Sequence, residues 1–354
     1  MVKGIILHGG SGTRLRPLTY SDVKQLLPVA GKPISEYALE NLIKIGISEV
    51  NIVIGSVGGE DVKKYYGDGS RWKIKITYTY QEKPIGIAHA IGMCREFTGE
   101  DKFVVYLGDN FLQYGIRDMS NKFLETGCET LLALTEVDNP SQFGIAEVQN
   151  DRITKLVEKP KEPKSKLAIT GIYFLSKSIY ESIDKLRPSA RGEYEITEAL
   201  QDQIDNGEKV LYSSVKGWFK DTGTVSDFLD CNRLVLDSMD ESTENSKRFN
   251  GRYMIGKDVK ISGNSTVLGP CYIGSGTTVE NSYIGPYTSI GSNCVIRNVE
   301  IGNSVIMDGA ILEFEEKYHM RESLVGPNAK IRTDRNHSKT MVVIMGRDSS
   351  MEFK

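Results

Sequence analysis

The sequence has few cysteines and no long hydrophobic run, and both absences exclude whole classes of protein. Its five cysteines include no C-x-x-C pair, so neither a zinc site nor a disulfide framework is expected. Reduced thiols and a cytoplasmic location are the simplest account of them. The first apolar run is too short for a signal peptide or a transmembrane helix, which predicts that no membrane is a partner.

An excess of charge of one sign is also missing. The formal net charge is -3 over 354 residues, which gives no extended field for a polyanion and predicts that the protein does not bind nucleic acid or a membrane surface. The composition is otherwise that of a globular protein, with 39% hydrophobic and 26% charged residues. A chain of this length exceeds what one hydrophobic core usually serves, so two domains are expected.

A phosphate-binding loop is predicted at the start of the chain. A short apolar strand ending at Leu7 leads into Gly9-Gly10-Ser11-Gly12-Thr13, and two cations, Arg14 and Lys24, follow. Backbone N–H groups of such small residues can converge on anionic oxygens, and an arginine adds a planar fork for the remaining charge. The loop has neither the Gly-Lys-Ser/Thr of a Walker loop nor the G-x-G-x-x-G of a dinucleotide fold. A plain strand-to-helix turn is the alternative interpretation.

A βαβ pattern follows the loop and leads to a candidate ligand position. Apolar residues from Ile34 to Ile45 fall on one helical face, and a β-rich run covers residues 50–54. The continuous apolar run 103–107 is typical of a strand buried on both faces of a parallel sheet. Asp109 comes directly after it, where open α/β sheets place ligands. A helix N-cap would explain an aspartate there equally well.

A repeat fills the last third of the chain. The polar stretch 240–250 is predicted to be a linker between domains 1–239 and 251–354. Aliphatic residues then recur every five or six positions: Ile255, Ile261, Val267, Ile273, Val279, Ile284, Ile290, Ile296, Ile301, Ile306 and Ile311. This period predicts a parallel β-helix of about three to four coils, at roughly eighteen residues per coil. Residues 342–345 are expected to be a closing strand over the coil end.

These motifs resemble those of the sugar-phosphate nucleotidyltransferases over the whole chain. The matching positions are Gly9–Leu15, Pro17–Thr19, Lys24, Lys32-Pro33, Gln81, Pro84, Gly86, Leu107–Asp109, Phe143-Gly144, Glu158–Pro160, Gly192-Glu193 and Trp218–Thr224. The resemblance implies a Rossmann-like α/β catalytic domain with a mixed sheet, followed by a left-handed parallel β-helix of hexapeptide repeats with a C-terminal cap. One departure is His8, where the family usually has alanine, and we interpret it as a hydrogen-bonded structural histidine.

The same resemblance implies an enzyme that transfers a nucleotidyl group from dTTP to glucose 1-phosphate and releases pyrophosphate. The implied nucleotide-binding residues are Gly10, Ser11, Gly12, Thr13, Gln81 and Gly86. The implied sugar phosphate-binding residues are Gly144, Glu158, Lys159 and Gly171. Arg14, Lys24 and Lys159 would be the catalytic cations, while Asp109 and Asp221 would share Mg²⁺. The flat faces and coil ends of a β-helix stack readily, so a homo-oligomer is also expected.

Two alternatives stay open. A sister enzyme that uses UTP or GTP, or another hexose phosphate, would carry nearly every residue named. In the second alternative, of a different class, the β-helix is an acyltransferase or a regulatory binding module. The only histidines near the repeat, His319 and His337, lie beyond its regular part, where neighbouring coils would not hold a catalytic base in position.

Overall fold

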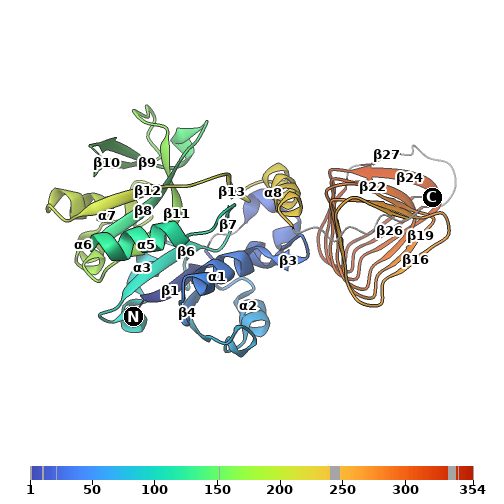
Figure 1. Ribbon diagram of the computed structural model, residues 1–354, viewed down its shortest axis with the longest axis horizontal. Helices are drawn as coiled ribbons and strands as arrows, with labels where there is room; N and C mark the ends of the chain where they lie inside the picture. Colours follow the sequence, from blue (N-terminus) through green and yellow to red (C-terminus); the bar gives the residue numbers. More distant parts are fainter. Residues whose placement is uncertain are drawn as a thin grey trace. The chain divides into compact units, whose positions relative to one another are not determined.

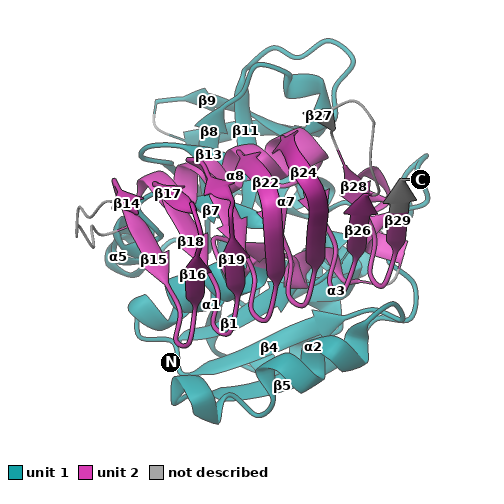
Figure 2. Cartoon of the chain, turned by 90° about the vertical axis from the view of Figure 1, so that its right-hand side faces the viewer, with its two compact units in different colours: residues 1–10, 35–220 teal, residues 11–34, 221–354 magenta. Residues whose placement is uncertain are grey.

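A computed structural model describes residues 2–9, 12–20, 22–150, 152–239, 248–333, 340–341 and 343–353. The chain forms two compact units, which Figure 2 colours separately. The first comprises residues 1–10 and 35–220, and the second comprises residues 11–34 and 221–354. The chain therefore passes between the units three times. The expected domain boundary at residue 239 stays a prediction, and residues 240–247 of the expected linker lie outside the described residues.

The first unit is built around a mixed β-sheet (Figure 1). Its path within the described chain is β10-β9-β11-β6-β1-β4-β5, and β8 pairs with both β11 and β12. Strands β6, β1, β4 and β5 are parallel, whereas β11 is antiparallel to β6, β8 and β9. The bounds are β1 Val2–Leu7, β4 Glu49–Ile54, β5 Lys75–Tyr80, β6 Lys102–Leu107, β8 Thr130–Glu136, β9 Gly144–Gln149, β10 Arg152–Glu158, β11 Leu167–Leu175 and β12 Val210–Ser214. The predicted mixed α/β fold is confirmed.

Helices cover this sheet, and a glycine in β1 allows one of them to pack closely against it. The helices are α1 Ile34–Lys44, α2 Gly59–Tyr66, α3 Ile87–Gly92, α4 Arg95–Thr98, α5 Arg117–Thr126, α6 Ile179–Lys185 and α7 Ile196–Asp205, with 3₁₀ turns at Ser70–Trp72 and Pro140–Gln142. A Cβ atom on Gly4 of β1 would lie 2.9 Å from Leu42 Cδ1, so the backbone of β1 must be bare where α1 packs on it. None of the helices in the described ranges is both long and apolar enough to cross a membrane.

The central strand β6 is the buried strand that its apolar run predicts. Phe103 through Tyr106 are fully buried. Phe103 and Val105 lie in one core cluster with Ile91 of α3. The Tyr106 hydroxyl accepts a hydrogen bond of 3.3 Å from Asn41 of α1, so helices cover both faces of the strand. Burial ends at the carboxyl end of β6, where Asp109 is half-buried. A short strand, β7 (Asn110–Leu112), follows directly and pairs with β13 (Phe219–Asp221). The sheet edge that holds Asp109 is thus built from the end of a rigid strand.

The second unit contains the predicted β-helix, visible as the stacked orange strands of Figure 1. One of its sheets, the β15 sheet, stacks six parallel rungs: β15 Tyr253–Ile255, β18 Cys271–Ile273, β21 Thr288–Ile290, β23 Val305–Ile306, β25 Leu324–Val325 and β28 Ile344–Met345. The other strands are β14 Phe249–Asn250, β16 Lys260–Ser262, β17 Thr266–Leu268, β19 Thr278–Glu280, β20 Tyr283–Ile284, β22 Val295–Gly302, β24 Ile311–Arg321, β26 Lys330–Thr333, β27 Thr340–Met341 and β29 Ser350–Phe353. Aliphatic side chains from successive rungs fill the interior.

The β-helix is longer than the repeat predicts. The residues Ile255, Ile273, Ile290, Ile306, Val325 and Met345 stack in register, at intervals of 18, 17, 16, 19 and 20 residues. The later coils were missed because their intervals lengthen around β24 and the aliphatic step is lost. Residues 342–345, expected to close the coil end, instead contribute Ile344–Met345 as a further parallel rung beside Leu324–Val325.

The second unit also contains residues 11–34 and a helix, α8 (Val225–Asp237). Residues 11–34 form 3₁₀ turns at Thr13–Leu15, Leu18–Tyr20 and Lys24–Leu26, and the two-stranded hairpin of β2 (Pro28–Val29) and β3 (Lys32–Pro33). Helix α8 begins with a capping box, in which Thr224 accepts from the Asp227 N–H and the Asp227 carboxylate accepts from the Thr224 N–H. All five cysteines are buried.

Candidate functional site

The predicted phosphate loop is shaped by its own backbone and by one buried anchor. Gly12 has φ 57°, in the left-handed region that favours glycine, and its carbonyl accepts a hydrogen bond of 2.6 Å from the Thr19 hydroxyl. Leu15 is buried, whereas Thr13 and Arg14 are exposed. The turn therefore presents its polar side chains to solvent from a fixed base. Gly10 and Ser11, also predicted for this loop, lie outside the described residues.

Two cations of the predicted nucleotide site meet the Asp221 motif within the second unit. Lys24 Nζ lies 3.5 Å from Asp221 Oδ1, and the lysine side chain is only 8% exposed. A Cβ atom on Gly223 would lie 3.1 Å from both terminal nitrogens of Arg14. Glycine at residue 223 leaves room for the guanidinium to lie close to the backbone there. The structure thus brings together Arg14, Lys24 and Asp221, which are almost two hundred residues apart in sequence.

His8 is buried in the first unit but is not the hydrogen-bonded histidine we expected. Its side chain is 6% exposed, and neither ring nitrogen has a hydrogen-bond partner among the described residues. The ring packs edge-on against Tyr66, with 6.0 Å between ring centroids. Burial lowers the pKa of the His8 imidazole to about 3, against a smaller upward effect of the Asp109 carboxylate. His8 is therefore a neutral, packed side chain beside the end of β6.

The two residues predicted to contact the base have clear protein partners. Gln81 is buried, and its Nε2 lies 2.8 Å from His89 Nδ1, a contact that fixes the orientation of the amide. Gly86 has φ 115°, and a Cβ atom there would lie 2.4 Å from the Tyr194 carbonyl oxygen. Packing against Tyr194 alone thus requires glycine at position 86. His89 was missed by sequence reasoning, since a lone histidine in a helix carries no recognisable signal.

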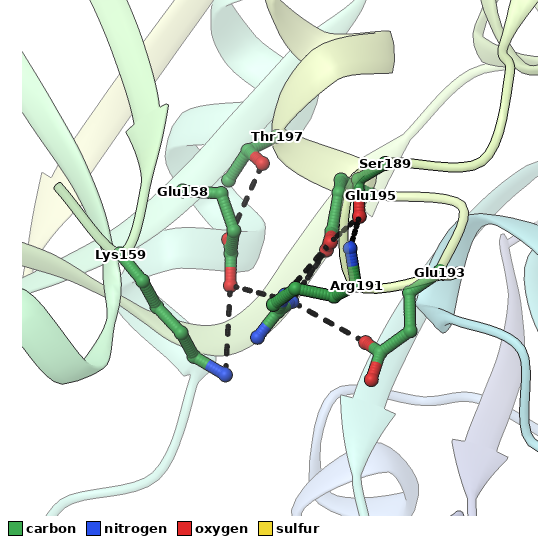
Figure 3. A network of polar contacts seen from close by, with 7 residues as sticks. All are labelled: Glu158, Lys159, Ser189, Arg191, Glu193, Glu195 and Thr197. Carbon is green, nitrogen blue, oxygen red and sulfur yellow. Dashed lines mark hydrogen bonds and ion pairs between the residues drawn. The ribbon is translucent and has the colours of Figure 1, made fainter.

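Two of the predicted sugar phosphate residues, Glu158 and Lys159, belong to one ionic network, drawn in Figure 3. Gly144 and Glu158 are paired residues on the antiparallel strands β9 and β10. A Cβ atom on Gly144 would lie 3.1 Å from Glu158 Oε2 and 2.7 Å from Thr197 Cγ2, so this floor is tightly packed. Thr197 donates a hydrogen bond of 3.2 Å to Glu158 Oε2, and Lys159 Nζ lies 3.9 Å from Glu158 Oε1. Gly171 lies on β11, where its Cβ would meet Leu107 at the end of β6.

Arg191 is the centre of this network and was not among the predicted residues. Its guanidinium contacts Glu195 at 2.8 Å, and Glu158 and Glu193 at 3.3 Å each. The only sequence signal was its position next to the Gly192-Glu193 motif. Three carboxylates thus surround two cations, Arg191 and Lys159. Burial, followed by repulsion from Glu195, raises the pKa of Glu158, while Lys159 and Arg191 oppose the shift.

The comparison with known proteins gives the family. Residues 3–238 match the family model described as Nucleotidyl transferase. The chain belongs to this family. The glucose-1-phosphate thymidylyltransferase of Streptomyces antibioticus is 38% identical, with 100% of each chain aligned. That of Streptomyces griseus is 41% identical, with 93% of each chain aligned. A solved structure from Bacillus anthracis, described as a glucose-1-phosphate thymidylyltransferase in complex with sucrose, has a TM-score of 0.64 and 38% identity, covering 69% of this chain and 98% of that one.

Nucleotidyltransferases of this family are generally metal-dependent, and the two predicted metal ligands suit a hard cation. Asp109 and Asp221 offer carboxylate oxygens, the donors that Mg²⁺ prefers. Across the described ranges, no three His, Cys, Asp or Glu side chains gather into a ready-made cage. A cation held by one or two carboxylates, with substrate phosphates as further ligands, fits that arrangement. The two aspartates belong to different units, so their sharing of one metal ion stays a prediction.

Proposed function

We propose that this nucleotidyltransferase transfers the thymidylyl group of dTTP to glucose 1-phosphate and releases pyrophosphate. The proposal rests above all on two thymidylyltransferase relatives that align over at least 93% of both chains. It is supported by the grouping of Arg14, Lys24 and Asp221 in one unit, and of Glu158, Lys159 and Arg191 in the other. A transfer between two phosphates needs cations at both substrates, and each group supplies them.

The chemistry requires positioning and charge stabilisation rather than a general base. The phosphate of glucose 1-phosphate is already an anion, so it can attack the α-phosphorus in line without losing a proton first. Arg14 and Lys24 would hold the β- and γ-phosphates and stabilise the charge that develops on the pyrophosphate. Lys24 is well suited to this because its ammonium lies on a nearly buried side chain. Mg²⁺ held by Asp109 and Asp221 would neutralise oxygens of the nucleotide.

The sugar phosphate would be received by the Arg191 network. Lys159 has a 44% exposed side chain, so its ammonium is available to a phosphate. The Glu158 carboxylate would accept hydrogen bonds from glucose hydroxyls, a use of anionic acceptors that gives strong and directional contacts. Arg191 and Thr197 hold that carboxylate in place from the side, through contacts of 3.3 and 3.2 Å. Gly144 keeps the adjacent floor free of a side chain.

Pyrophosphate release measured over a matrix of nucleotides and sugar 1-phosphates tests the assignment. The matrix should include dTTP, UTP, GTP and ATP against the 1-phosphates of glucose, galactose, mannose and N-acetylglucosamine. We expect the highest kcat/KM for dTTP with glucose 1-phosphate. Because dTTP and UTP differ by one methyl and one hydroxyl group, discrimination between them is expected to be modest. A purine nucleotide that outperforms both pyrimidines would contradict the proposal.

Two further proposals concern assembly and location. Stacked β-helices would make the protein a homo-oligomer, and light scattering that gives the mass of a single chain would contradict this. Five buried cysteines, none of which forms a disulfide, support a reducing compartment, the cytoplasm, as the place of work.

A further inference from the structure

The segment that carries Lys24, residues 22–33, ends in a turn that its own sequence does not favour. This Lys24 segment closes with the hairpin of β2 and β3, whose two turn residues are Ala30 and Gly31. Both have positive φ, 49° and 81°, as a type I′ turn requires. Glycine adopts that conformation freely, whereas alanine resists it because of its Cβ atom. Something outside the hairpin must therefore stabilise the turn at Ala30.

Asn232 of α8 provides that stabilisation and connects the turn to the β-helix. Its Oδ1 accepts hydrogen bonds from the Ala30 N–H at 2.9 Å and from the Ser289 hydroxyl at 2.7 Å, and its Nδ2 donates to the Tyr287 carbonyl at 3.0 Å. The side chain is fully buried. The three bonds fix which end of the amide is oxygen, because one end must accept and the other must donate. Asn232 therefore joins the Lys24 segment to two residues around β21.

A second contact places a β-helix aromatic ring directly on the turn. A Cβ atom on Gly31 would lie 2.1 Å from Tyr272 Cζ, so the ring of this β18 residue covers the glycine backbone. No side chain fits at position 31 while Tyr272 keeps its place. Gly31 thus serves the turn twice, through its positive φ and through the ring that lies on it.

The other end of the Lys24 segment is held by the last coil. Arg347, two residues after β28, forms an ion pair with Asp22 through both Nε and Nη2. Asp22 is buried and lies two residues before Lys24. The contacts come from β18, the region of β21 and the end of β28, which are rungs of one sheet. One face of the β-helix therefore contacts both ends of the ten-residue stretch from Asp22 to Gly31.

We propose that the β-helix is a platform that positions Lys24 for catalysis, and that Asn232 is the positioning residue at its centre. The inference rests on the role of Lys24 in the proposed function. A segment fixed at both ends leaves the ammonium little freedom, and a displacement of about 1 Å at a catalytic group can cost 10²-fold in rate. In this chain the repeat domain thus contributes to turnover through contacts with the Lys24 segment, and not only to assembly.

Steady-state kinetics on full-length variants test the proposal. Asn232→Ala should lower kcat about 10- to 100-fold while leaving the KM for glucose 1-phosphate unchanged. Ser289→Ala removes a single donor and should give a smaller decrease in the same direction. Ser304→Ala is the matched control, because its hydroxyl bonds the Gly302 carbonyl and the Ser323 N–H, both within the β-helix. It should lower the melting temperature with kcat unchanged.

A double-mutant comparison separates failure of the inference from failure of the proposed function. Lys24→Ala should be severely slowed, and Lys24→Ala combined with Asn232→Ala should be no slower, because both changes remove the same contribution. If Lys24→Ala turns over dTTP and glucose 1-phosphate normally, the role that the proposed function gives to Lys24 is wrong. If Lys24→Ala is slow while Asn232→Ala and Ser289→Ala match the wild type, the platform is rejected. Should Asn232→Ala fail to fold, Ser289→Ala against Ser304→Ala decides, and equal kcat in these two would also reject it.

Discussion

Replacing Asp221 with asparagine distinguishes two roles that the structure allows for this carboxylate. Asp221 lies 3.5 Å from Lys24 Nζ, so it is an ion-pair partner of a catalytic cation, and it is also a predicted metal ligand. Asparagine keeps the shape and most hydrogen-bonding ability of aspartate but removes the charge. The variant therefore leaves the local fold intact and changes only the electrostatics.

The two roles predict rates that differ by orders of magnitude. The Asp221 side chain is 34% exposed, and an ion pair in such a setting contributes only about 0.2–1 kcal/mol to stability. If that were its whole role, Asp221→Asn would show a small drop in melting temperature and nearly normal turnover. Loss of a charge-stabilising contact at the reacting phosphate costs about 10²- to 10³-fold in kcat, or roughly 2.7–4 kcal/mol of activation free energy. We expect the second outcome.

The assay is kcat as a function of Mg²⁺ concentration, with thermal unfolding of the same samples. We expect Asp221→Asn and Asp109→Asn to melt close to the wild type, to be slowed at least 10²-fold, and to require more Mg²⁺. The double variant should be little worse than the slower single variant, because the two carboxylates act as one unit. Asp61→Asn, at an exposed residue of helix α2, is the matched control and should be unaffected. Near-normal turnover of either folded single variant, or full activity of the wild type in excess EDTA, would refute the shared metal.

Three further predictions concern the first unit. Glu158→Gln should raise the KM for glucose 1-phosphate about 10- to 100-fold, since a charged acceptor contributes about 1.5–3 kcal/mol. The melting temperature should not fall, because burial already disfavours the Glu158 charge and raises the pKa of this carboxyl. An unchanged KM would contradict the sugar-binding role. Arg191→Met removes a cation that contacts the carboxylates of Glu158 and Glu195. The pKa of Glu158 should therefore rise further, and the acidic limb of the kcat/KM profile should move to higher pH. An unmoved limb would contradict this role of Arg191. His8 is held neutral with a pKa of about 3, whereas an unfolded histidine titrates near 6.5, so the unfolded state binds an extra proton between these pH values. The free energy of unfolding should therefore fall with decreasing pH by about 1.4 kcal/mol per pH unit in this range. Denaturant unfolding of His8→Leu should show a shallower pH dependence of this free energy, and equal slopes for the variant and the wild type would contradict the burial of a neutral His8.

Strand patterns and local motifs were readable from the sequence because their signals are short-range. The apolar run that became β6 and the aliphatic period that became the first coils each lie within a few tens of residues. The position of Asp109 at the end of β6 followed from the same local pattern. These elements could be predicted because burial on both faces or in a coil interior imposes its period on the sequence directly.

Contacts between distant segments could not be predicted. Nothing in the sequence around Ala30 indicates that its N–H bonds Asn232, 202 residues away. Arg191 is equally hidden, because its role depends on the spatial convergence of carboxylates from β10 and from the start of α7. The β-helix was underestimated for a local reason, since its later coils vary in length and no longer repeat every six residues. For His8 the prediction was wrong because buried polar side chains usually form hydrogen bonds, whereas neither ring nitrogen of His8 has a partner among the described residues.

The interleaved course of the chain through its two units constrains how the protein can fold during synthesis. Residues 11–34 belong to a unit whose remaining parts begin only at residue 221. At about 5–20 residues per second on the ribosome, Ala30 must wait roughly 10–40 s for Asn232 to be made. Asp22 is 325 residues from Arg347 and waits longer still, roughly 16–65 s. The segment that carries Lys24 is thus translated well before the residues that hold it, so a nascent chain should gain catalytic competence only after Arg347 has emerged from the ribosome.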